Sequence, residues 1–250
     1  MPRLVILGTA NAIPDPEREN THMALVGQQH TVLIDCAGTP NVHLSKAGIP
    51  FGSISDLIVT HFHPDHTSGV PLLLMNMWLL GRQEPLRIYG LHHCLERLEH
   101  MMALYQWDNW PNFFPVAFHR LPERERMLVM ESRDFRIYSS PVRHMVPTIG
   151  LRMESVSGER VVVYSGDTEP CGPLIRLASG ADVLIHEASG GGVGHSTAEQ
   201  AGEVARQAEV GQLLLIHYPW GAETEQLPER ARSVFQGEVA LARDFMEIGL

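Results

Sequence analysis

The stretch that most constrains the fold is residues 54–66, ISDLIVTHFHPDH, where an apolar run ends directly in a cluster of histidines and an aspartate. A short run rich in branched aliphatic residues predicts a buried strand. Four potential metal ligands then fall within six positions, namely His61, His63, Asp65 and His66. Burying a polar ring without a partner is unfavourable, so this crowding at a strand end predicts a binding pocket.

Three further candidate ligands, His144, Asp167 and His217, stand at the ends of other strand-like runs, FRIYSSPVRH, RVVVYSGD and QLLLIHY. Loops at the carboxyl ends of strands carry function in α/β sheets, so we expect all of these side chains to meet. Imidazole and carboxylate suit zinc and similar divalent ions. Two ions about 3.5–4 Å apart can share a water, and Asp167 is placed to bridge them.

The remaining pattern predicts one α/β domain spanning residues 1–250. Strands come first along the chain, and strands then alternate with helices, which is typical of a layered sandwich. The expected strands are 3–8, 30–38, 54–61, 84–90, 116–121, 135–144, 148–154, 160–167, 181–189 and 212–218. The expected helices are 67–81, 92–107, 172–179, 196–208 and a last one over about 226–248.

Composition narrows the function classes. The formal net charge is −10 and no Lys/Arg cluster is present, which argues against a protein that coats nucleic acid. The most apolar segment, 69–81, is too short to span a bilayer, and the first residues do not resemble a signal peptide, so we expect no membrane partner and a cytoplasmic location. Three distant cysteines indicate neither a disulfide framework nor a thiolate zinc site.

THFHPDH resembles the HxHxDH motif of the metallo-β-lactamase superfamily. Within it, LLGRQEPLRIYG, YSGDTEPC, ADVLIHEAS and GHSTAEQA resemble segments of ribonuclease Z, the tRNA 3′-end processing endonuclease, in the same order. The likeness covers nearly the whole chain. It implies a four-layer αββα sandwich, two metal ions per chain (zinc first, with manganese and iron as alternatives) and a homodimer.

The resemblance also implies residue roles. One ion would be held by His61, His63 and His144, the other by Asp65, His66 and His217, with Asp167 bridging. Asp65 is implied in proton transfer as well, and His195 of the HST motif in protonating the leaving group. Asp35 would orient the ligand loop. Next to His195, Ser196 and Glu199 have the spacing of a capping box, which predicts a helix start that favours an anion.

Ribonuclease Z carries a long Gly/Pro/basic arm that grips tRNA, between the segments matching His144 and Asp167. Only 22 residues separate these two positions here, and no basic Gly-rich insertion stands elsewhere. The first hypothesis is therefore a phosphodiesterase that cleaves a small or nucleotide-like phosphodiester with a metal-bridging hydroxide. The alternatives are a tRNA 3′-end endonuclease, a thioesterase, lactonase or arylesterase, and a metal-binding module without activity. The aromatic stretch 105–114 fits either packing or a pocket or dimer face.

Overall fold

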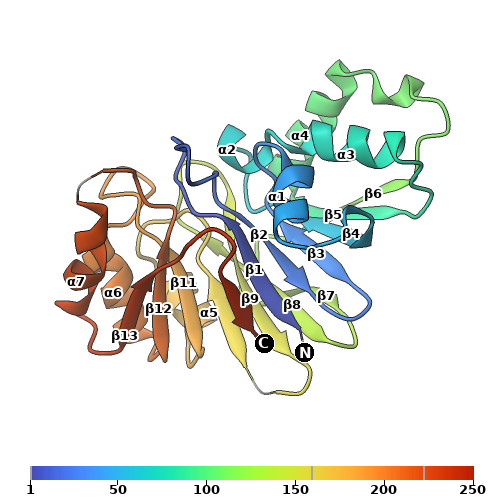
Figure 1. The fold of residues 1–250 in the computed structure, drawn as a ribbon. Helices are drawn as coiled ribbons and strands as arrows, with labels where there is room; N and C mark the ends of the chain where they lie inside the picture. The colour runs from blue at the N-terminus through green and yellow to red at the C-terminus, as the bar shows by residue number, and fades with distance from the viewer. Residues whose placement is uncertain (1, 159, 222) are drawn as a thin grey trace.

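The computed structural model describes residues 2–158, 160–221 and 223–250, which form two seven-stranded sheets packed face to face (Figure 1). The first sheet has the order β14-β1-β2-β3-β4-β5-β6 and the second β13-β12-β11-β10-β9-β8-β7. The first contains β1 (Arg3–Gly8), β2 (His22–Val26), β3 (Thr31–Ile34), β4 (Ile54–Ile58), β5 (Leu86–Leu91), β6 (Val116–Leu121) and β14 (Glu247–Gly249). The second contains β7 (Met127–Glu131), β8 (Phe135–Val142), β9 (Thr148–Ser155), β10 (Val161–Tyr164), β11 (Val183–Glu187), β12 (Gln212–Ile216) and β13 (Glu238–Leu241).

Helices cover the outer face of each sheet (Figure 1). The first sheet is flanked by α1 (Pro40–Lys46), α2 (Pro64–Thr67), α3 (Val70–Leu79) and α4 (His92–Leu104), and the second by α5 (Gly172–Ala178), α6 (Ala198–Gln207) and α7 (Leu227–Arg232). Short 3-10 turns occupy Phe51–Ser53, Trp107–Asn109 and Thr224–Gln226. Among the described residues, no helix is long and apolar enough to cross a membrane.

Three apolar clusters hold these layers together. One lies between the sheets and joins side chains such as Ile58 of the first to Ile185 of the second. The other two lie between each sheet and its own helices, where Leu73 of α3 and Val204 of α6 are buried. Helix, sheet, sheet and helix therefore follow one another, and the predicted αββα sandwich is confirmed.

The neighbouring strands β3 to β6 run parallel to one another, and so do β10 to β13. Parallel strands end at one edge of a sheet, so the loops after them gather there. The segment after β4 reaches the second sheet, because the Ile149 amide donates to the Thr60 carbonyl at 3.2 Å. The candidate ligands lie at this shared edge.

The predicted final helix over 226–248 is wrong. Only α7 is helical there, and β13 and β14 follow it. β13 extends the second sheet in parallel with β12, whereas β14 pairs with β1 in the first sheet. The strands are favoured because their apolar side chains, such as Val239 and Ile248, are buried at the sheet edges. Pairing with distant strands thus outweighs the local helical spacing.

Other expectations need smaller revisions. The strands β2 and β7 and the short helix α2 were not predicted, and the expected helix 67–81 is shorter in the structure, where it is α3 (Val70–Leu79). In the stretch 105–114, Trp107, Trp110 and Phe113 are partly buried against the cluster over the first sheet, and Trp110 stacks on Trp78 at 5.1 Å between ring centroids. The stretch therefore packs on the first sheet, and Trp107, Trp110 and Phe113 also line a surface pocket.

Candidate metal centre

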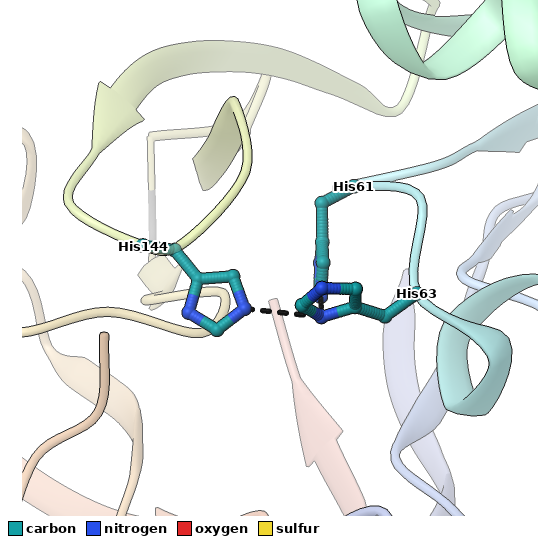
Figure 2. Close-up of side chains that lie close together, drawn as sticks. All are labelled: His61, His63 and His144. Carbon is teal, nitrogen blue, oxygen red and sulfur yellow. Dashed lines mark hydrogen bonds between the residues drawn. The ribbon is translucent and has the colours of Figure 1, made fainter. Parts of the chain in front are cut away.

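Three histidines from the two sheets point toward one another (Figure 2). His61 and His63 lie in the segment between β4 and α2, and His144 follows β8. His63 Nδ1 lies 3.1 Å from His61 Nε2 and 3.1 Å from His144 Nε2. Ligand atoms bound tetrahedrally to one zinc at about 2.0–2.1 Å would be ~3.3 Å apart. The spacing of these nitrogens therefore fits a shared ion.

A second group, Asp65, His66, Asp167 and His217, lies beside the first. Asp167 Oδ2 is 3.4 Å from His66 Nε2 and 3.2 Å from His217 Nε2. The same oxygen lies 3.8 Å from His61 Nε2, which belongs to the first group. One carboxylate thus contacts both groups, the arrangement expected of a bridging ligand between two ions.

Two buried polar atoms that lack a hydrogen-bond partner show whether this set of donor atoms fits a cation. His66 Nε2 and Asp167 Oδ1 are buried and make no hydrogen bond within the described residues. Such atoms are unfavourable unless something else satisfies them. Nitrogen and carboxylate donors are also the ligands that zinc, manganese and iron accept. The residues therefore fit a dinuclear metal site.

The hydrogen bonds of the buried histidines leave Nε2 free for a metal. His66 Nδ1 lies 2.8 Å from Asp35 Oδ2, and since a carboxylate only accepts, this ring nitrogen is the donor. Thr60 donates its hydroxyl proton to Asp35, so its oxygen accepts from His61 Nδ1 at 3.0 Å. Asp35 therefore orients both rings, directly and through Thr60.

His217 and His144 follow the same rule. Thr21 donates to the Ala10 carbonyl, which leaves its oxygen to accept from His217 Nδ1 at 3.1 Å. His144 Nδ1 donates to the Gly194 carbonyl at 2.7 Å. His217 adopts a left-handed backbone conformation with φ of 53°. This conformation is uncommon outside glycine and costs about 1–3 kcal/mol, so the surrounding contacts hold the ligand there.

Burial and neighbouring charges set the protonation of the centre. Burial lowers the pKa of His61 well below its usual value and that of His217 to about 4. Burial alone would raise the pKa of Asp167, but the His217 and His66 charges outweigh it and hold that pKa well below the usual range. The Asp167 and Asp35 carboxylates in turn outweigh burial and raise the pKa of His66 well above its usual value. A cation bound here would take the place of the His66 proton beside the ionised Asp167 carboxylate.

His195 lies beside this cluster and is held by Glu187, at the end of β11. His195 Nδ1 donates to Glu187 Oε1 at 3.0 Å, and the ring centroid of His195 lies 4.9 Å from that of His144. The hydrogen bond from Glu187 raises the pKa of His195. Burial raises the pKa of Glu187 to about 7, although the His195 hydrogen bond opposes it. His195 thus keeps its proton to higher pH than an unperturbed histidine would.

Sequence reasoning missed Glu187. Its Oε1 also accepts from the backbone amides of Thr168 and Ser196, and its Oε2 from that of Ser189. The one signal for it was its place at the end of the run ADVLIHE, next to the edge that carries the other ligands.

The predicted capping box of Ser196 and Glu199 is one residue off. Thr197 is the N-cap of α6 and forms the capping box with Gln200. Ser196 cannot serve there, because its hydroxyl is fully buried and donates to the Thr168 carbonyl at 2.7 Å. Thr168 follows Asp167 directly. The start of α6 is therefore tied to the segment that carries the proposed bridging carboxylate.

The fold and this cluster define a metal-dependent hydrolase, and residues 30–218 match the beta-lactamase superfamily domain. The chain belongs to that superfamily. Within it, the chain is ribonuclease Z-like: it is 30% identical to a ribonuclease Z of Methanothermobacter thermautotrophicus, over 94% of this chain and 92% of the relative.

Solved structures show the same fold. The metallo-beta-lactamase fold protein YhfI of Bacillus subtilis superposes with a TM-score of 0.84 at 22% identity, covering 99% of this chain and 98% of that one. The short form of human tRNase Z gives 0.79 at 25% identity, with the same coverage of 99% and 98%. These likenesses extend over both sheets, so they confirm the fold that the sequence predicts.

Proposed function

We propose that this chain is a phosphodiesterase of the ribonuclease Z type. The observation that carries the proposal is the buried Glu187 that holds His195 beside the metal-ligand cluster. A proton donor next to two cation sites suits cleavage of a phosphodiester, because the departing oxygen needs a proton. The names of the relatives, ribonuclease Z and tRNase Z, favour tRNA as the substrate.

Each residue has a proposed role. His61, His63 and His144 hold one ion, and the other is held by Asp65, His66 and His217, with Asp167 shared between them. When bound, two divalent ions lower the pKa of a water and offset negative charge on the phosphoryl group. Zinc is the proposed metal, with manganese and iron as alternatives.

Two side chains would move protons. His195 protonates the leaving oxygen through Nε2, because Nδ1 is already engaged by Glu187. Asp65 lies 3.5 Å from His66 Nε2 and 3.8 Å from His217 Nε2, and its side chain is partly exposed. We assign Asp65 a second role as a proton acceptor beside its role as a ligand.

A compact phosphodiester is the second candidate substrate. The alignment with the Methanothermobacter relative runs over 296 positions, whereas this chain has 250 residues, so that relative contains segments that this chain lacks. His144 and Asp167 are connected here by little more than the antiparallel pair β9 and β10. Without those segments the chain has less surface with which to hold a large substrate, and this supports a smaller one.

The test compares substrates on metal-loaded protein of known metal content. A precursor tRNA, bis(p-nitrophenyl) phosphate and a p-nitrophenyl thioester would be assayed with the wild type, His195→Ala and the control His100→Ala, which changes an exposed histidine of α4. We expect cleavage of the tRNA and of the diester, a large loss with His195→Ala, and wild-type rates with His100→Ala. Cleavage of the diester alone would favour the compact substrate. Turnover of the thioester alone would contradict a phosphodiesterase.

A further inference from the structure

The carbonyl that orients His144 belongs to a glycine in a short loop. Gly194 has φ of 80°, and a Cβ at this position would lie 2.8 Å from His144 Nδ1. Gly194 therefore lets its backbone approach the ligand ring closely. The next residue is His195, so this one loop positions both a candidate metal ligand and the proposed proton donor.

A carboxylate outside the ligand set anchors that loop. The Gly194 amide donates to Glu169 Oε1 at 2.8 Å. The side chain of Glu169 is 34% exposed, and its other oxygen lies 4.0 Å from the Arg143 guanidinium, a distance at the limit of an ion pair. The bond to Gly194 is thus the closer of these two contacts of the carboxylate.

The backbone of Glu169 is fixed in turn. Its amide donates to the Arg143 carbonyl at 2.8 Å, one residue before His144. Glu169 also lies two residues after Asp167. Three segments that carry functional groups therefore meet at Glu169, namely 143–144, 167–169 and 194–195.

We propose that Glu169 is a positioning residue for the metal centre. Its carboxylate holds the Gly194 amide, and this keeps the Gly194 carbonyl on His144 Nδ1. The hydrogen bond at Nδ1 fixes the tautomer that presents Nε2 to the ion bound by His61, His63 and His144. Without Glu169 the Gly194 amide loses its acceptor, and the Gly194 carbonyl is then no longer held on His144 Nδ1.

The test measures metal binding, so its result does not depend on which ester the enzyme cleaves. Zinc would be titrated into metal-free protein in competition with a chromogenic chelator, for the wild type, Glu169→Ala and Glu169→Gln. Amide hydrogen exchange would be followed over residues 190–195. Glu131→Ala serves as the control, because this exposed glutamate pairs with Arg136 on the outer strands β7 and β8.

We expect Glu169→Ala to weaken one of the two zinc sites by about 10–100-fold. Exchange over 190–195 should become faster in that variant. Glu169→Gln keeps an oxygen that accepts from Gly194, so it should restore most of the affinity. Glu131→Ala should bind zinc like the wild type.

Gly194→Ala provides a second route to the same conclusion. Its Cβ would displace His144, so it should weaken the same zinc site, and adding Glu169→Ala should weaken it no further. Unchanged affinity and exchange in Glu169→Ala would overturn the proposal. So would a Glu169→Gln variant as weak as Glu169→Ala, or fully additive losses in the double variant.

Discussion

The inner and outer sides of the metal centre are built differently. On the inner side, His61, His66 and His217 are at most 1% exposed, and buried side chains orient each ring through Nδ1. On the outer side, His144 and His195 are partly exposed and are oriented by a loop carbonyl and by Glu187. The inner candidate ligands are thus oriented by buried side chains next to the strand ends, whereas the candidate ligand His144 and the proposed proton donor His195 are oriented by the segment 187–196.

This difference separates an inner side that carries only candidate metal ligands from an outer side that carries the candidate ligand His144 together with the proposed proton donor His195. Changes on the inner side should remove ions, because each ring there is oriented by one hydrogen bond at Nδ1. Changes around Glu187 should leave the ions in place and alter the reaction. The following substitutions test this separation, beginning with the largest expected effect.

Asp167→Asn should remove activity and reduce the bound metal from about two ions per chain to one or fewer. The carboxylate contacts both ligand groups, and the amide lacks the negative charge that offsets two cations. Elemental analysis of the purified protein measures the loss. Asp134→Asn is the matched control, since Asp134 accepts from the Gln28 amide in an exposed turn. Retention of two ions in Asp167→Asn would show that this residue does not bridge them.

Asp35→Asn should weaken metal binding by about 10–100-fold without removing a ligand. Asp35 accepts from Thr60 and from His66 Nδ1, and an amide nitrogen in its place would face one of these donors. His66 would then favour the tautomer that protonates Nε2. Chelator competition measures the affinity. Wild-type affinity in Asp35→Asn would mean that the metal itself orients the ring.

Glu187→Gln should change the pH dependence while the metal content stays at the wild-type value. Glu187 raises the pKa of His195, so the protonated donor persists to higher pH. As pH rises through that pKa the donor is lost, and kcat/KM should fall. Removing the carboxylate lowers this pKa, so the fall should begin at lower pH.

Profiles of kcat/KM against pH provide the measurement for Glu187. They would be recorded for the wild type, Glu187→Gln and the control Glu199→Gln, whose carboxylate pairs with Arg230 on the outer helices α6 and α7. The control should keep the wild-type profile. An alkaline limb that does not move in Glu187→Gln would contradict the role of this carboxylate.

The sandwich could be predicted from the sequence alone. So could the meeting of the candidate ligands at one edge, because each follows the end of an apolar strand. The motif around His61 and the runs before His144 and His217 are local signals, and the structure places their side chains together. The hydrogen bond of Glu187 to His195 joins two turns of the chain whose meeting depends on tertiary packing, so no local pattern revealed it.

The same limit explains the error at the carboxyl end. The segment after α7 mixes charged and apolar residues, and its spacing resembles a helix. Its strands are short and gain their partners from distant parts of the chain, β12 and β1. Long-range pairing of this kind carries little signature in a single short segment.

Thr21→Val should give the smallest effect on the inner side. The neutral hydroxyl of Thr21 joins His217 Nδ1 to the Ala10 carbonyl, and valine would leave the ring N–H buried without a partner. We expect the metal-free protein to lose about 1–3 kcal/mol of unfolding free energy. Thr21→Ser keeps the hydroxyl and should be close to the wild type. Thermal unfolding and chelator competition measure both variants. Thr21→Val should weaken metal binding less than Asp35→Asn does. An equal loss of affinity in the two variants would mean that a neutral hydroxyl orients its histidine as firmly as the buried carboxylate does, so the charge of Asp35 would not be what makes its effect larger.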